Sequence, residues 1–466
     1  MLRESSKEAS AETFRELLSS GQVKVAVVGL GRIGLPTAAM FAKAGAVVRG
    51  VDINPRLVES INSGRNVFID EPGLTEIVKE VVKNGKLQAT LEPSSAISAS
   101  DFVIVSVPTP VLETKSPDYS AVMTACRTIG KNMKRGCTVI IESTIGPGTA
   151  ENLVLPILEK ESGLRAGADF GLASCPERSD PGNILSNMRS LPRVVGGIDA
   201  KYTELVASLY EAVLGTKVIR VSNPRTANAV KLTENLFRDV NIALMNEFAL
   251  LYEKLGIDTI EVINACSTKY NFMPHYPGPG VGGPCLPSNS YYLIEEGIKA
   301  GNIPYLIRMA REINDRMPEH VVELVFEAMN EVNKTIAGST ICVLGVSYKQ
   351  NVKDIQLTPV ERICKRLRSM GAKIKIYDPM YAGEEVFGFK VEKTLEEAVS
   401  ASDCIIIGTA HNEFKGLDIK KLSSLMNEKP AMVDTRDIIS PFLAKSSGFA
   451  YRGVGRPSVI NEPNSK

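Results

Sequence analysis

The sequence has little of what several common kinds of protein need. Its 466 residues include three histidines, which are too few and too scattered to form a metal-ligand cluster. The eight cysteines contain no CxxC pair, which argues against a zinc site and a disulfide framework. With a net charge of +1 there is no basic excess to neutralise phosphates, so no nucleic-acid partner is expected. Since no apolar run is long enough for a membrane span or a signal peptide, we expect no membrane partner and a cytoplasmic location.

The remaining composition is typical of a folded protein with two or three domains, with 44% hydrophobic and 23% charged residues. Strand-like apolar runs alternate with helical stretches up to about residue 222, which predicts a doubly wound, mostly parallel α/β sheet. The predicted strands are 23–28, 46–51, 102–107, 138–142, 170–173 and 217–221. Predicted helices at 226–255, 257–265, 291–300 and 304–330 form a helical middle domain. The α/β pattern returns after residue 338, with strands at 340–345, 373–378 and 404–408.

The first predicted strand leads directly into a dinucleotide-binding fingerprint. Gly29 permits a tight turn, Gly31 lets the backbone approach a pyrophosphate, and Gly34 allows a helix to pack closely on the strand. The free amides at the start of that helix favour an anion. Asp52 ends the second strand, where its carboxylate suits a ribose 2′-hydroxyl and would repel a 2′-phosphate. The pattern predicts a Rossmann domain that binds NAD.

Two more strand ends lie where such sheets hold ligands, at 106–110 and 143–148. The third segment repeats the α/β pattern of the first but keeps only one glycine, Gly345, after its opening strand. We therefore expect a second Rossmann-like sheet that binds something other than a dinucleotide. We therefore predict four parts along the chain: a polar N-terminal extension (1–21), the NAD domain (22–222), the helical central domain (223–335) and the second α/β domain (336–466).

Cys285 lies in a loop, residues 277–289, which is too rich in glycine and proline to be the interior of a helix or strand. Such a loop can bring one thiol and several backbone amides against a ligand. Lys231 and Asn235 share one face of the long predicted helix, where they could stabilise an oxyanion. Glu177 places a carboxylate near the end of another strand. A nicotinamide site together with a loop-borne thiol suggests oxidation through a covalent thioester.

Taken in order, these motifs resemble the UDP-sugar 6-dehydrogenase family over about residues 22–460. The matching pieces are Gly29-x-Gly31-x-x-Gly34, Ser143-Thr144-Ile-Gly-Pro-Gly-Thr149, Pro176-Glu177-Arg178, Lys231-x-x-x-Asn235, the loop from Gly278 to Cys285, Gly345-x-x-Tyr348-Lys349 and Asp434-Thr-Arg436. The resemblance implies a homodimer or higher oligomer, UDP held mainly between the middle and C-terminal domains, and two NAD⁺ consumed per sugar.

The resemblance also implies roles for individual residues. Cys285 would trap the C6 aldehyde and carry the thioester, while Thr144 and Glu177 would place the water that hydrolyses it. Lys269 falls where some relatives place an arginine that reaches into the neighbouring subunit. The predicted catalytic residues are Cys285, Lys231, Asn235, Glu177, Thr144 and Asn289. The predicted cofactor-binding residues are Gly29, Gly31, Arg32, Ile33, Gly34, Asp52, Pro108, Thr109 and Thr144. The predicted substrate-binding residues are Glu177, Arg178, Lys231, Asn235, Lys269, Gly282, Tyr348, Lys349 and Arg436.

Two positions depart from the family pattern. Asn289 stands where most relatives carry an aspartate, and an amide can position a water but cannot take its proton. Gln356 stands where relatives often place an arginine near the cofactor phosphates, which leaves that role to Arg32 or Lys353. The segment 267–278 resembles the acetamido-sugar branches, particularly UDP-N-acetylglucosamine enzymes. The gluco, manno or galacto configuration of the sugar stays open.

The predicted function is therefore NAD-dependent oxidation of a UDP-N-acetylhexosamine to its uronic acid. UDP-glucose and UDP-N-acetylgalactosamine are alternative substrates. A rival is a 3-hydroxyacid-type dehydrogenase, which shares a Rossmann domain followed by helices but leaves Cys285 and the third segment unexplained. Another rival is a catalytically silent nucleotide-sugar-binding relative, which Asn289 and Gln356 would fit.

Overall fold

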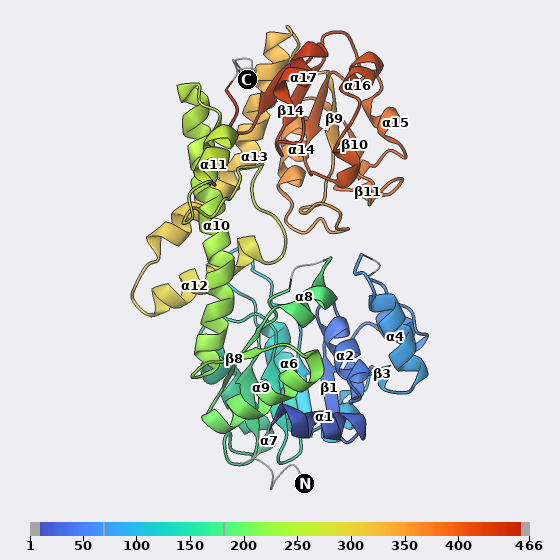
Figure 1. Ribbon diagram of the computed structural model, residues 1–466, viewed down its shortest axis with the longest axis vertical. Coiled ribbons are helices and arrows are strands. Elements are labelled where there is room, and N and C mark those ends of the chain that lie inside the picture. The colour runs from blue at the N-terminus through green and yellow to red at the C-terminus, as the bar shows by residue number, and fades with distance from the viewer. Residues whose placement is uncertain (1–9, 69, 180–181, 458–466) are drawn as a thin grey trace. The chain divides into compact units, whose positions relative to one another are not determined.

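The computed structural model describes residues 10–68, 70–179 and 182–457. The chain divides into two compact units (Figure 1). Unit 1 comprises residues 1–234 and 291–302, and unit 2 comprises residues 235–290 and 303–466. Within the described ranges, no helix is both long and apolar enough to cross a membrane.

Unit 1 is built on an eight-stranded sheet with the order β3-β2-β1-β4-β5-β6-β7-β8. Its strands are β1 (Lys24–Val28), β2 (Val47–Val51), β3 (Leu87–Thr90), β4 (Phe102–Val105), β5 (Thr138–Ile141), β6 (Gly171–Ser174), β7 (Arg193–Gly197) and β8 (Val218–Arg220). All neighbouring pairs are parallel except β6 and β7. The central strands β4, β5 and β6 are buried along their whole length, which explains their continuous apolar sequence. The predicted doubly wound, mostly parallel sheet is confirmed.

The helices of this unit cover the sheet. They are α1 (Ala11–Ser19), α2 (Gly34–Lys43), α3 (Pro55–Asn62), α4 (Leu74–Lys83), α5 (Pro93–Ser98), α6 (Ser120–Asn132), the π-helix η2 (Ala150–Val154), α7 (Leu155–Ser162), α8 (Ile184–Ser190) and α9 (Ala200–Leu214). The sequence predicted only a polar extension before residue 22, but α1 buries Phe14 and Leu18 in the core. Its apolar positions recur at helical spacing, which is the signal for an amphipathic helix.

Unit 2 contains a five-stranded parallel sheet with the order β10-β9-β13-β14-β15. Its strands are β9 (Thr340–Leu344), β10 (Lys373–Tyr377), β13 (Cys404–Ile407), β14 (Ala431–Asp434) and β15 (Ala450–Gly453), with a short hairpin of β11 (Glu385–Val386) and β12 (Phe389–Lys390). Its other elements are α11 (Thr259–Cys266), α13 (Tyr305–Glu331), α14 (Pro359–Ser369), α15 (Leu395–Val399), the 3₁₀ helix η3 (Asn412–Phe414), α16 (Ile419–Leu425) and α17 (Pro441–Ser446).

Two helices, α10 (Pro224–Leu255) and α12 (Leu286–Lys299), contribute residues to both units. The bounds of α10 match the predicted long helix. Helix α12 begins five residues earlier than the predicted 291–300, so Asn289 lies in a helical turn and not in the glycine loop. The physical reason is that the loop ends with Cys285, whose carbonyl accepts the first helical hydrogen bond from the Asn289 amide at 2.8 Å.

Candidate active site

The glycine fingerprint of unit 1 has the three properties that a dinucleotide requires. Gly29 has φ +91°, and a Cβ on Gly34 would lie 1.8 Å from the Gly29 carbonyl oxygen. Gly31 is exposed, and no described atom lies within 4 Å of the place its Cβ would take. The first and third glycines are therefore required by the fold, whereas the second leaves open space for a ligand. This arrangement fits NAD at the N-terminal end of α2.

Asp52 lies beside this turn at the end of β2. Its Oδ2 accepts a hydrogen bond from the Leu30 amide at 2.8 Å, and its Oδ1 accepts one from Asn54 at 2.9 Å. The carboxylate is thus held in place, with acceptor capacity left for a ribose hydroxyl. Ile53 follows it and is 96% exposed, so it offers an apolar surface at the same edge.

Two further predicted cofactor residues lie at the start of α2. Arg32 pairs with Asp70 at 2.8 Å and lies over the Phe68 ring at 5.5 Å. Its guanidinium is therefore engaged within the protein. Ile33 precedes the first residue of α2 and is half-buried.

The loops that follow β4 and β5 are joined by hydrogen bonds. The Thr109 hydroxyl donates to the Thr144 carbonyl oxygen at 2.8 Å, and the Ser143 hydroxyl donates to the Val107 carbonyl oxygen at 2.8 Å. Pro108 lies exposed between these contacts. The structure therefore brings together the two strand ends that the sequence singled out, at the carboxyl edge of the sheet where ligands bind in such folds.

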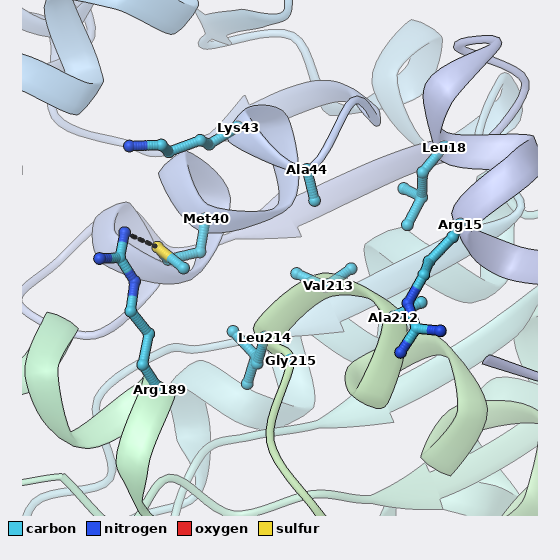
Figure 2. A pocket seen from close by; sticks show the side chains of 10 residues that line it. All are labelled: Arg15, Leu18, Met40, Lys43, Ala44, Arg189, Ala212, Val213, Leu214 and Gly215. Atoms are coloured by element: carbon cyan, nitrogen blue, oxygen red, sulfur yellow. Dashed lines mark hydrogen bonds between the residues drawn. The ribbon is translucent and has the colours of Figure 1, made fainter. Parts of the chain in front are cut away.

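A hollow of about 400 Å³ lies elsewhere in unit 1, at the C-terminal ends of α2 and α9 (Figure 2). Arg15, Lys43 and Arg189 line it, and all three are exposed. Cations near helix C-termini interact favourably with the free carbonyl groups there. Because the glycine fingerprint lies at the opposite end of α2, this hollow is separate from the dinucleotide edge.

The loop after β6 carries Glu177 and Arg178. The buried carboxylate of Glu177 pairs with the Arg193 guanidinium. Arg178 pairs with Glu234 on α10, through its Nε at 3.0 Å and through Nη2. Arg178 is thus occupied by a protein carboxylate, three residues beyond Lys231 on the same helix. Lys231 is buried, at 7% exposure, and makes no ion pair with any described residue.

The thiol of unit 2 stands at the start of a helix. Cys285 is exposed and directly precedes α12. The amides of a helix's first turn point toward this position, and they stabilise negative charge nearby. The side-chain nitrogens of Asn235 and Asn289 are buried without a hydrogen-bond partner among the described residues. Two unsatisfied buried donors require a partner, and a substrate oxygen or a water would supply it.

A buried polar network connects these elements. The Ser290 hydroxyl donates to Asp239 on α10 at 3.0 Å, and Asp239 pairs with Arg311 on α13 at 2.6 Å. Asp239 lies four residues after Asn235, and Ser290 directly follows Asn289. The Asp239–Ser290 bond therefore fixes both helices beside the two unsatisfied amides.

The same network holds the beginning of the glycine loop. Asn314 donates to Asp239 Oδ1 at 2.8 Å, and Asn246 donates to Asn314 at 2.8 Å. Asn246 in turn accepts the Gly278 amide at 2.9 Å. This network was not predicted from the sequence. The sequence pattern that could have indicated the network is a pair of polar side chains seven residues apart on α10 and a pair three residues apart on α13. Each pair lies on a helix face that packs inward.

The rest of the glycine loop packs against the loop after β9. A Cβ on Gly283, at φ +89°, would lie 2.6 Å from the Tyr348 ring, and one on Gly282 would lie 2.9 Å from the Leu357 carbonyl oxygen. Gly283 also donates to the Gln356 carbonyl oxygen at 2.9 Å. Gln356 thus contacts the thiol loop through its backbone, while its exposed side chain lies 3.5 Å from Asp354.

A cavity of about 310 Å³ lies in unit 2, lined in part by Tyr276, Pro277, Thr435 and Arg436. Arg436 donates to the Gly408 carbonyl oxygen at 2.9 Å and makes no ion pair within the described residues. Burial lowers the pKa of Arg436 to about 10, because removing the guanidinium from water disfavours its charged form. The nearby Asp434 carboxylate acts to raise the pKa but offsets only part of this effect. The cavity therefore offers a guanidinium that an anion such as a phosphate would stabilise.

The last two predicted substrate residues are less enclosed. Lys349 is half-buried on the loop after β9, and Lys269 is exposed just after α11. Neither is among the residues that line the cavity at Arg436.

The chain matches three family models in sequence. They are the UDP-glucose/GDP-mannose dehydrogenase family NAD binding domain at residues 23–214, the central domain at 225–316 and the UDP binding domain at 342–441. A protein named UDP-N-acetyl-D-mannosamine dehydrogenase, from Pyrococcus horikoshii, is 39% identical over 94% of this chain and all of its own length. A UDP-N-acetyl-D-glucosamine 6-dehydrogenase from Pseudomonas aeruginosa is 35% identical over 90% of this chain and 97% of its own.

A solved structure of a UDP-N-acetylmannosamine dehydrogenase from Pyrococcus horikoshii agrees, with a TM-score of 0.87 over 94% of this chain and all of that one. These likenesses exclude the 3-hydroxyacid dehydrogenase rival. They confirm NAD as the cofactor and the two α/β domains with a helical centre. The residues given catalytic and binding roles stay predictions. This chain belongs to the UDP-glucose/GDP-mannose dehydrogenase family and is an NAD-dependent nucleotide-sugar dehydrogenase.

Proposed function

We propose that this protein oxidises the C6 hydroxyl of a UDP-N-acetylhexosamine to a carboxylate through a thioester on Cys285. The observation that carries the proposal is the exposed thiol at the start of α12, in the same unit as the unsatisfied amides of Asn235 and Asn289. A dehydrogenase that stopped at the aldehyde would need neither the thiol nor the two donors. The names of the relatives support the substrate class.

The chemistry proceeds in two oxidations and a hydrolysis. When bound, NAD⁺ accepts the hydride that leaves C6 in each oxidation. The first oxidation turns the alcohol into an aldehyde, to which the Cys285 sulfur adds to form a thiohemiacetal. The second oxidation gives the thioester, and water then cleaves the carbon–sulfur bond to release the acid and restore the thiol. One sugar, two NAD⁺ and one water thus give the carboxylate, two NADH and three protons.

The residues of the chain divide this work. Lys231 and Asn235 stabilise the oxyanion that develops on C6, because an ammonium and an amide stand one helical turn apart on α10. Thr144 and Glu177 orient the hydrolytic water. Asn289, a buried donor on α12 without a hydrogen-bond partner among the described residues, donates to a substrate oxygen or a water.

The two nucleotides are held by different parts of the chain. Gly31 and Asp52 would hold the pyrophosphate and ribose of NAD, and the exposed side chain of Ile53 would offer an apolar surface to its adenine. Arg436 binds the UDP phosphates, and Lys349 and Tyr348 contact the nucleotide from the loop after β9.

Among the N-acetylhexosamines we place UDP-N-acetylmannosamine first. The relative and the solved structure that are each 39% identical carry that sugar in their names. UDP-N-acetylglucosamine is second, because relatives at 32% and 35% identity carry it.

We also infer a homodimer formed through α10. Phe237, Leu244 and Leu251 follow one another at intervals of seven residues, and each is more than 40% exposed. Residues at this spacing share one helix face, and a second copy of the face would cover them. Leu244→Lys should give a monomer in light scattering, and an unchanged mass would contradict this interface.

A cytoplasmic location is proposed from the cysteines. None of the eight forms a disulfide within the described residues, and six are buried, as suits a reducing compartment. Finding the protein outside the cytoplasm in a fractionated cell would contradict this.

The experiment that tests the function counts NADH formed per sugar consumed. Purified protein is supplied with NAD⁺ and limiting UDP-N-acetylmannosamine, UDP-N-acetylglucosamine, UDP-N-acetylgalactosamine or UDP-glucose in separate reactions. We expect two NADH per sugar with an N-acetylhexosamine and a uronic acid product. One NADH per sugar would refute the thioester route, and none with any sugar would favour a silent nucleotide-sugar-binding protein.

A further inference from the structure

Three ionisable side chains are buried together in unit 1, where two strands end and a third begins. Glu142 follows β5, Glu177 lies in the loop after β6, and Arg193 opens β7. Their exposed fractions are 3%, 6% and 2%. Charged groups this deep are found where they are paired and hydrogen-bonded, so the contacts of each one matter.

Arg193 joins the two carboxylates. One of its terminal nitrogens donates to Glu142 at 2.8 Å and to the Cys175 carbonyl oxygen at 3.0 Å. The other pairs with Oε2 of Glu177. The guanidinium carbon also lies 5.2 Å from the centre of the Tyr210 ring. The planar, forked shape of the guanidinium allows it to serve two partners at once, which a lysine ammonium could not do in the same geometry.

The second oxygen of Glu177 is also occupied. Its Oε1 accepts hydrogen bonds from the Arg178 amide at 2.7 Å, from the Ser179 amide at 2.8 Å and from the Ser179 hydroxyl at 2.6 Å. These donors all stabilise the charged form of the carboxylate. Oε2 keeps capacity for one more donor beside Arg193.

Glu142 has a different set of partners. Tyr210 donates to its Oε1 at 2.8 Å, and Thr37 donates to its Oε2 at 3.0 Å. Burial raises the pKa of Glu142, and the guanidinium offsets only part of that effect. Burial also acts to raise the pKa of Glu177, but Arg193 and Ser179 outweigh it and lower the pKa. Of the two carboxyl groups that share one guanidinium, Glu177 is therefore the one whose charged form its surroundings favour.

We propose that Arg193 is a positioning residue that holds Glu177 as an ionised acceptor, so that Glu177 orients the hydrolytic water and takes no proton from it. In this scheme the carbon–sulfur bond of the thioester breaks as the carbon–oxygen bond forms. One proton of the water returns to the departing Cys285 sulfur, and the other leaves the new acid for solvent. The inference rests on the proposed function, because it concerns the hydrolysis step of that reaction.

A second arrangement of the same groups serves as a control. Arg220 pairs with Glu204 at 2.7 Å and with Glu211 at 2.7 Å in the same unit. This carboxylate–guanidinium–carboxylate array has the composition of the buried one, but its arginine is about one third exposed. It touches no residue with a proposed catalytic role, so a change there reports only on structure.

The test measures the acid limb of the kcat pH profile in three variants. Arg193→Lys weakens the hold on Glu177, raises the pKa of that carboxyl group and should move the limb upward by about one pH unit. Glu142→Gln removes the competitor for the guanidinium and should move the limb downward. Arg220→Lys should leave it unchanged.

Arg193→Lys should also slow hydrolysis relative to oxidation. Rapid mixing would then show a burst of about two NADH per site before the slower steady rate, because the thioester accumulates. If Arg193→Lys does not fold, the shift of the acid limb in Glu142→Gln still tests the inference.

The outcomes separate this inference from the proposed function. Wild-type protein that forms two NADH per sugar upholds the function whatever the variants do. If Arg193→Lys and Glu142→Gln lower kcat equally at every pH, without moving the acid limb or changing the burst, Arg193 has only a structural role and the inference is wrong.

Discussion

The sheets of the two units begin in the same way and then diverge. Gly29 follows β1 with φ +91°, and its amide donates to Val51 of the neighbouring strand at 2.8 Å. Gly345 follows β9 with φ +86°, and its amide donates to Tyr377 at 2.8 Å. Each sheet thus opens with a left-handed glycine, and this shared turn is a property of the scaffold and not of the ligand.

The next residues give the two sheets different functions. In unit 1 the loop continues to exposed Gly31, and Asp52 keeps acceptor capacity for a ligand. In unit 2 the equivalent aspartate, Asp378, is fully buried and accepts the Val346 amide at 2.7 Å. His411 donates to it from Nε2 at 3.1 Å, because Nδ1 of that ring accepts the Asn351 amide at 2.9 Å.

Equivalent backbone positions therefore leave open space in one sheet and form a closed internal contact in the other. The difference lies in whether a glycine or a side chain follows the first turn. The second sheet is left to bind a nucleotide by other means, which agrees with the UDP binding domain that matches residues 342–441.

The largest expected effect concerns the thiol, which belongs to unit 2 alone. Cys285→Ser should abolish steady production of the acid, because a hydroxyl is a poorer nucleophile and an oxygen ester hydrolyses more slowly than a thioester. Binding of NAD⁺ to unit 1 should be unchanged. Product analysis measures the loss of acid production, and a binding titration measures the affinity for NAD⁺. Near-native turnover by the serine variant would mean that Cys285 carries no covalent intermediate.

The next largest effect concerns the part of α10 that belongs to unit 1. Lys231→Ala should lower kcat by a factor on the order of 10² to 10³, the range for the loss of one donor that stabilises an oxyanion. Asn289→Asp, on the unit 2 side, should keep two NADH per sugar and change mainly the pH dependence of the rate. An active enzyme indifferent to Lys231→Ala would refute the mechanism but leave the function. An inactive wild type rescued by Asn289→Asp would favour a silent relative.

The two equivalent aspartates give a matched pair of intermediate effect. Asp378→Ala should cost about 3–5 kcal/mol of unfolding free energy, because it removes the partner of several buried donors. Asp52→Ala should cost far less stability and instead narrow the preference for NAD⁺ over NADP⁺. Thermal unfolding measures the loss of stability, and kinetics with NAD⁺ and with NADP⁺ measure the cofactor preference. The comparison fails if Asp52→Ala destabilises as much as Asp378→Ala, or if the wild type already uses both cofactors equally.

The smallest expected effect is a pH dependence of unit 2. His320 lies 3.0 Å from Glu253, and although burial acts to lower its pKa, Glu253 and Glu323 raise the pKa above the ordinary 6.5. Its contribution to stability is therefore complete below pH 6.5 and is lost as pH rises through the raised pKa. His320→Gln should remove about 1.5 kcal/mol at pH 6 and less at pH 8. Equal losses at both pH values would contradict the ion pair. His275→Gln, which makes no carboxylate contact among described residues, is the control.

The sequence predicted the elements whose pattern is local. The strand, glycine turn, helix and aspartate of the first βαβ unit lie where they were expected, because each needs only its own neighbours. The start of α12 was missed, since Pro287 and the glycines before it are typical of a loop, although proline is well tolerated in a helix's first turn. Strand β7 was missed because its two glycines weaken the strand pattern.

The buried ion array of unit 1 could not be assembled from the sequence. Glu142 and Arg193 are 51 residues apart, and only the strand order β5-β6-β7 brings their ends together. A charged residue next to an apolar strand was the available signal. By contrast, Cys285 and Asn235 could be chosen from chemistry and spacing, and Asn289 from the family resemblance. The structure adds that the side-chain nitrogens of the two asparagines are buried without a hydrogen-bond partner among the described residues.

The central claim is that each sheet serves its own nucleotide, NAD on unit 1 and UDP on unit 2. Calorimetric titration of wild type and Gly31→Val with NAD⁺ and with UDP tests it most directly. A Cβ at Gly31 has no described atom within 4 Å, so the substitution should leave the fold intact. We predict one NAD⁺ and one UDP per chain in the wild type, and a variant that loses NAD⁺ binding while it keeps UDP binding and its unfolding temperature. Two NAD⁺ per chain, or loss of both nucleotides in the variant, would contradict the account.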